Sequence, residues 1–120
     1  MNEYRLADYL EHMQRAATDV RSLVEGLDRP AFLADKRTQS AVIMSLVIVG
    51  EAATKLMEHH AQFVARHPEV PWRNMGGMRD RIAHGCFDIN LDVVWETVPS
   101  ALPTLLNQLR VISPEPADKN

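Results

Sequence analysis

Residues 39–67, QSAVIMSLVIVGEAATKLMEHHAQFVARH, decide the fold of this chain. Between residues 36 and 67 there is no proline and only one glycine. The apolar run at the start of this stretch, taken alone, would also suit a buried strand because it is rich in valine and isoleucine. A helix is favoured instead because apolar side chains keep a spacing of three and four residues to the end of the stretch, as at Leu46, Ala53, Leu56 and Phe63.

A helix of about 30 residues would be about 45 Å long. Its first half is apolar on nearly every side, and such a helix must be covered on several faces. We therefore expect it to lie at the centre of a helical bundle, with one face available for a second subunit.

The segments on either side also have helical patterns. Apolar residues recur at steps of three and four from Leu6 to Leu27, which predicts a first helix over about 3–26 that ends at Gly26. A short helical turn is expected at Pro30, directly after the possible caps Asp28 and Arg29.

Proline divides the second half of the chain. Pro68 ends the long helix, and a further helix is expected over about 72–86. Asn90 can cap a last helix, which Pro99 and Pro103 must kink or restart, with Ser100 as the candidate new cap. The prediction is an all-α, up-and-down bundle of four long helices plus a short helical turn, formed by residues 1–112. Residues 113–120 are expected to be a disordered tail.

The composition fits one soluble cytoplasmic domain. The chain has 120 residues, of which 46% are hydrophobic, and its single cysteine, Cys86, cannot form a disulfide within the chain. No signal peptide is evident, and the apolar stretch 41–53 is too short to cross a bilayer. The net charge is −3, so a nucleic-acid role needs a local basic patch or the combined patches of two chains.

A local basic patch does occur around residues 78–87, MRDRIAHGCF. Arg73, Arg79 and Arg81 make this region positive, and an imidazole such as His84 beside them suits a phosphate. Arg79 and His84 lie about 140° apart around a helix, so they do not share one face. On spacing alone, a solvated helix with a capping histidine is the alternative.

Two other kinds of site are disfavoured by the sequence. Cys86 is a poor nucleophile, because a helix C-terminus disfavours the thiolate and His84 is only two residues away. The histidines of the long helix lack the spacing of a metal site, so no metal and no cofactor is expected.

The order of motifs over residues 4–112 resembles the HepT-like toxin branch of the HEPN superfamily. The segments that carry the resemblance are FLADKRTQSAVIMSLVIVGEAATKL (32–56), PEVPWRNMGGMRDRIAHGCFDINLDVVWETV (68–98) and LPTLLNQL (102–109). Its most specific residues are Gly50, Glu51, Ala52, Pro71, Trp72, Arg73, Gly77, Met78, Arg79, His84, Phe87 and Trp95.

This resemblance implies a metal-independent endoribonuclease that works as a homodimer, with the RxxxxH motifs of the two chains meeting across a cleft. Arg79, Asp80 and His84 fill that motif here. By resemblance, His84 is the general acid or base, Arg79 stabilises the scissile phosphate and Asp80 orients the histidine. Arg73 and Arg81 are the expected contacts to RNA phosphates.

The resemblance also implies a partner. HepT-like toxins are usually encoded beside an MNT-type nucleotidyltransferase antitoxin, in the type VII (HepT/MntA) arrangement, and some partners adenylylate a tyrosine two residues after the motif histidine. Cys86 stands at that position here, so neutralisation is expected by binding or by modification elsewhere. The alternative function is a non-catalytic HEPN scaffold or substrate-binding partner of a nucleotidyltransferase.

Overall fold

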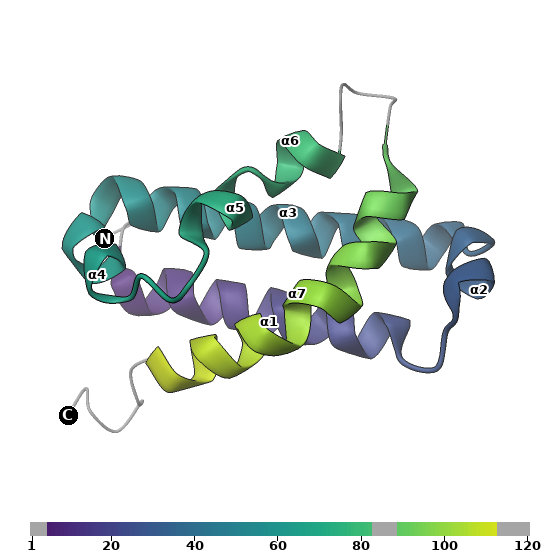
Figure 1. Ribbon diagram of the computed structural model, residues 1–120, viewed down its shortest axis with the longest axis horizontal. Coiled ribbons are helices and arrows are strands. Elements are labelled where there is room, and N and C mark those ends of the chain that lie inside the picture. The colour runs from purple at the N-terminus through teal and green to yellow at the C-terminus, as the bar shows by residue number, and fades with distance from the viewer. Residues whose placement is uncertain (1–4, 83–88, 113–120) are drawn as a thin grey trace.

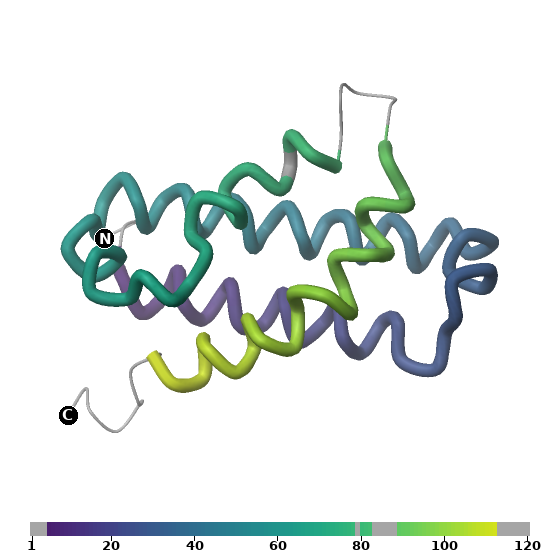
Figure 2. Tube along the Cα trace, in the orientation of Figure 1, coloured from purple at the N-terminus to yellow at the C-terminus, as the bar shows by residue number. Residues whose placement is uncertain are grey.

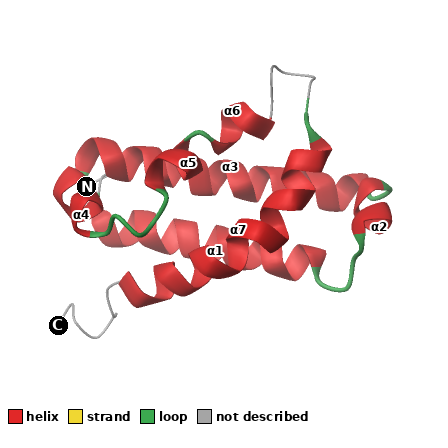
Figure 3. Cartoon of the chain, in the orientation of Figure 1, coloured by secondary structure: helices red, strands yellow, loops and turns green. Residues whose placement is uncertain are grey.

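The computed structural model (Figure 1) describes residues 5–82 and 89–112, apart from the side chain of Arg79. The all-α prediction is confirmed, because the described residues form helices and loops and no sheet (Figure 3). The helices are α1 (Leu6–Val24), α2 (Arg29–Leu33), α3 (Lys36–His59), α4 (Ala61–Arg66), α5 (Trp72–Gly76), α6 (Met78–Ile82) and α7 (Leu91–Ile112). The tail 113–120 lies outside the described residues, so its disorder stays a prediction.

The core lies where α1, α3 and α7 meet. In Figure 1, α1 and α3 lie side by side and run in opposite directions, while α7 crosses α3 near its own start and then follows α1. The apolar faces of the three helices are fully buried there, as at Leu10, Met13, Val42, Leu46, Val94 and Leu109. The amphipathic spacing of the first helix is therefore explained, and Gly26, with φ of 81°, follows its end as expected.

Helix α3 is shorter than predicted from the sequence. It ends at His59, and α4 begins again at Ala61, so the expected continuous helix to residue 67 is wrong. His60, with φ of −137° and ψ of 49°, interrupts the helical backbone. The break turns α4 so that the buried ring of Phe63 lies 4.6 Å from His67 and 6.3 Å from Trp72, measured between ring centroids.

The apolar composition of α3 follows from its central place. Its 24 residues are by length and hydropathy enough to cross a membrane, although the stretch 41–53 alone is too short. In the fold, nine residues of α3 are buried against neighbouring helices. A helix covered on several faces by its own protein has the same composition as a membrane span.

The helix predicted over 72–86 is divided in two within its described part. Helix α5 ends at Gly76 and α6 starts at Met78, while residues 83–86 lie outside the described residues. Helix α5 lies so close to α3 that a Cβ atom built on Gly50 would be 2.7 Å from the carbonyl oxygen of Met75. Only glycine at position 50 allows α5 to lie this close to α3. The position of α5 in turn fixes where the chain enters α6.

Helix α7 is kinked, and it does not restart. Pro99 and Pro103 lie inside one helix whose axis changes direction part-way (Figure 2). Each proline lacks the N–H that an interior helical residue normally donates, which accounts for the bend. Ser100 is therefore not a new cap, and its hydroxyl donates instead to the carbonyl oxygen of Glu96 at 2.6 Å.

Polar contacts fix the start of α7 against the end of α6 and against α2. The backbone N–H of Asn90 donates to the carbonyl oxygen of Ile82 at 2.7 Å, and its side chain caps α7 by accepting from the N–H of Val93 at 3.1 Å. The predicted cap is thus confirmed. Arg29 of α2 also forms an ion pair with Asp92.

Asp35, the cap of α3, makes stability depend on pH. Its carboxylate accepts hydrogen bonds from the hydroxyl and the N–H of Thr38, at 2.7 and 3.1 Å, and these lower its pKa below the usual 3.8. Because the pKa is lower in the folded chain, the stabilisation is present above the unfolded pKa and is lost as the pH falls through the folded value. We expect Asp35→Asn to flatten the fall in the urea midpoint between about pH 5 and about pH 2. A smaller flattening of the same sign should follow Thr38→Val, which removes the hydroxyl donor and keeps the N–H donor.

Candidate active site

The motif helix α6 is fixed on α3 by its apolar side chains. Met78 and Ile82, four residues apart, are both buried, with 5% and 1% of their surface exposed. Asp80 and Arg81, which lie between them, are exposed. The local sequence therefore produces a short helix whose apolar side is anchored and whose charged side faces solvent.

The structure describes only part of the predicted RxxxxH site. Arg79 belongs to α6, but its side chain is not among the described ones, and His84 and Cys86 lie outside the described residues. The pairing of Arg79 with His84, and the orienting role of Asp80, stay predictions. Among the residues described, Asp80 forms no ion pair that could hold it away from its motif neighbours.

The two arginines predicted to contact RNA phosphates are exposed but lie in different hollows. Arg73 on α5 lines a shallow hollow beside Trp72 and Met57. Arg81 on α6 lines a larger groove, and its guanidinium lies over Gly77, with Nη1 at 3.7 Å from a Cβ atom built there. Neither arginine pairs with an acid of the described chain, so both are available to an anion.

The groove beside Arg81 was not anticipated from the sequence. It has a volume of about 420 Å³ and lies between α3, the α5–α6 segment and α7. We call it the α6 groove and define it by its apolar wall of Leu46, Val49, Met75, Met78, Leu102 and Leu105. Glu69 and Gln108 also line it, and they come from parts of the chain that are 39 residues apart.

Comparison with known proteins decides the family. The family model described as "Ribonuclease HepT-like" matches residues 13–112, which include α6, the whole RxxxxH motif and α7. This chain belongs to the HepT-like ribonuclease family. The resemblance drawn from the sequence motifs is thereby confirmed.

Relatives in this family align over most of their length. "Probable ribonuclease HepT" of Thermococcus cleftensis is 39% identical over 98 residues, which are 82% of this chain and 86% of the relative. A protein of Methanocaldococcus jannaschii named as a candidate RNase is 36% identical over 107 residues, which are 89% of this chain and 83% of that protein. Another protein named as a candidate RNase, from Caldanaerobacter subterraneus, is 34% identical over 104 residues, which are 87% of this chain and 90% of that protein. No solved structure matches this chain at a significant level.

Proposed function

We propose that this HepT-like chain is a metal-independent endoribonuclease that cleaves RNA through Arg79, Asp80 and His84. The observation that carries the proposal is the family match over residues 13–112, which spans the complete motif, together with relatives named as ribonucleases. The anchored α6, with its charged side exposed, supports it, because a cleavage site must accept a bulky polymer from solvent.

The residue types suit a reaction that needs no metal. RNA supplies its own nucleophile, the 2′-hydroxyl, which loses its proton to a base as the new 2′-O–P bond forms. The P–O5′ bond then breaks, the 5′ oxygen takes a proton, and a 2′,3′-cyclic phosphate remains. We assign the proton transfers to His84 and stabilisation of the charged phosphorane to Arg79. Asp80 orients the imidazole, and Arg73 and Arg81 contact neighbouring phosphates.

We further propose that the active form is a homodimer built on an exposed side of α3. We call this side the α3 stripe and define it by Arg37, Met44, Ile48, Glu51 and Glu58, which follow one another at steps of seven, four, three and seven residues. Met44 is 60% and Ile48 is 39% exposed, and they lie one turn apart. Two large apolar side chains side by side on an otherwise charged face are typical of a protein contact.

The charges of the α3 stripe suit a second copy of the chain. An antiparallel copy related by a two-fold axis beside Val47 and Ile48 would bring Arg37 opposite Glu58, so each end meets the opposite charge. A two-fold axis perpendicular to both α3 helices leaves both α6 helices on the same side of the pair. Leu46 and Val49 share the α6 groove with Met78, so α6 is level with this axis. The proposed pair therefore places the two α6 helices at the same level along α3.

We place this nuclease in the cytoplasm as the toxin of a type VII (HepT/MntA) pair, with an MNT-type nucleotidyltransferase as its antitoxin. The family match supports this role. Cys86 occupies the position of the tyrosine that such partners modify, and a thiol does not replace a phenol as an acceptor. The partner is therefore expected to act by binding, or by modifying another residue.

The test is cleavage of total RNA and tRNA by the purified chain in EDTA, with His84→Ala alongside. We expect cleavage to persist in EDTA, to leave 2′,3′-cyclic phosphate ends and to fall by about 100-fold to 10,000-fold in the variant. Cys86→Ser is the matched control and should cleave like the unchanged chain. Equal cleavage by His84→Ala would refute the assignment. A dimer that cleaves nothing would favour the non-catalytic scaffold.

A further inference from the structure

The α6 groove has the size and the walls of a small-molecule site. Its volume of about 420 Å³ falls in the range of ligand pockets in general. Its walls are mostly aliphatic and thioether side chains, which suit the flat face of an aromatic ring. Met78 and Arg81 of the motif helix form part of these walls, so a group seated here lies directly beside α6.

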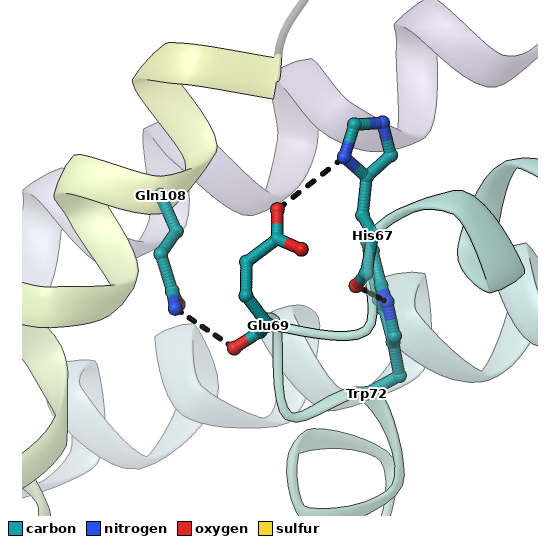
Figure 4. A network of polar contacts seen from close by, with 4 residues as sticks. All are labelled: His67, Glu69, Trp72 and Gln108. Atoms are coloured by element: carbon teal, nitrogen blue, oxygen red, sulfur yellow. Dashed lines mark hydrogen bonds and ion pairs between the residues drawn. The ribbon is translucent and has the colours of Figure 1, made fainter.

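A fixed network holds the far side of the groove (Figure 4). The Nε2 atom of Gln108 donates to the carbonyl oxygen of Glu69 at 2.8 Å, and the Glu69 carboxylate lies 3.4 Å from Nδ1 of His67. The carbonyl oxygen of His67 in turn accepts from Nε1 of Trp72 at 2.9 Å. The amide nitrogen of Gln108 is thus committed to the protein.

The oxygen of the same amide has no such partner. Among the described residues, Oε1 of Gln108 is the buried side-chain acceptor that lacks a hydrogen bond. Leaving an acceptor buried and unpaired is costly, so a donor brought into the groove would gain by reaching it. Glu69 lines the groove as well, with its carboxylate beside His67. The unpaired oxygen of Gln108 therefore needs an N–H donor from a ligand, and Arg81 on α6 supplies a positive charge.

We propose that the α6 groove binds the base of an RNA nucleotide adjoining the cleavage site, and that it prefers adenine and cytosine, with their amino groups at C6 and C4, to uracil. This inference rests on the proposed function. Adenine and cytosine present an amino group to Gln108, whereas uracil presents a carbonyl oxygen at the corresponding edge. The apolar walls hold the ring, and Arg81 binds the phosphate of the same nucleotide. An acceptor at this position favours a base that places an amino group there over a base that places a carbonyl oxygen there.

The test measures binding of AMP, CMP and UMP to the full-length His84→Ala chain, which keeps the groove. We expect AMP and CMP to bind about 10-fold more tightly than UMP, the effect of about one hydrogen bond. Gln108→Leu should remove this difference without removing binding, and Arg81→Gln should weaken all three nucleotides. Gln62→Leu, on the exposed side of α4, is the control and should change nothing.

The outcomes separate this inference from the proposed function, because nucleotide binding needs no cleavage. Equal affinity for the three nucleotides, no binding at all, or an unchanged preference in Gln108→Leu would overturn the base site even if the chain cleaves RNA. A preference for AMP and CMP that depends on Gln108, in a chain that cleaves nothing, would support the base site and overturn the nuclease. In the active chain, cleavage should then occur beside adenine and cytosine more often than beside uracil.

Discussion

Gly50→Ala is expected to lower the free energy of unfolding by about 2 kcal/mol, although alanine is the better helix former by about 1 kcal/mol. The new Cβ atom would lie 2.7 Å from the carbonyl oxygen of Met75. That atom belongs to the α5 backbone, so the clash is relieved only if α5 moves away from α3. Because α5 leads directly into α6, cleavage should fall by more than the loss of folded chain explains. The measurements are urea unfolding and cleavage at a temperature where the variant stays folded.

Two neighbouring glycines provide matched controls. A Cβ atom on Gly76 would lie 2.9 Å from Cε of Met57 and 3.0 Å from Oγ1 of Thr54, and both are side-chain atoms that can turn aside, unlike the α5 backbone. At Gly77 the nearest atom would be at 3.4 Å, an ordinary contact. We expect both alanine variants to stay within about 1 kcal/mol of the unchanged chain. If Gly50→Ala were as stable as these controls, the close approach of α5 would not be a constraint.

The sequence predicts those parts of the fold that local chemistry determines. Asp28 caps α2 as expected, accepting from the N–H of Ala31 at 3.0 Å, and Asn90 caps α7 in the same way. The kink in α7 follows from its prolines. The break at His60 was missed because no glycine or proline marks it; it depends on the burial of Phe63 against residues that come later in the chain.

The candidate site likewise has a part that the sequence predicts and a part that only the tertiary fold determines. The spacing of Arg79 and His84 alone also fits a solvated helix with a capping histidine. The family match over the whole motif favours the nuclease interpretation instead. The α6 groove was missed because its walls come from α3, α5, α6 and α7 together. A signal was present in LPTLLNQL, where Gln108 stands among apolar residues, but its partner, the carbonyl oxygen of Glu69, is fixed only by the tertiary fold.

Replacing both Met44 and Ile48 with aspartate is expected to produce a folded monomer that cleaves RNA about 100-fold more slowly or worse. In the proposed dimer Ile48 lies near its own copy at the axis and Met44 lies opposite Glu51 of the partner subunit, so the new carboxylates would repel one another and that glutamate. The fold should survive, because both side chains are exposed in the single chain. Cleavage should fall because small displacements of catalytic groups already cost about 100-fold. Light scattering and the EDTA cleavage assay measure the two effects.

Val111→Asp is the matched control for this variant. Val111 is 74% exposed near the end of α7, away from the α3 stripe, so the same substitution there should leave both dimer and cleavage unchanged.

Charge reversal tests the orientation of the pair. Arg37→Glu alone should weaken the dimer by placing two acids together, and adding Glu58→Arg should restore it, since each end again meets the opposite charge. A parallel pair, or contact through another face, would give no such rescue. A Met44→Asp, Ile48→Asp chain that remains dimeric and active would exclude the α3 stripe as the interface.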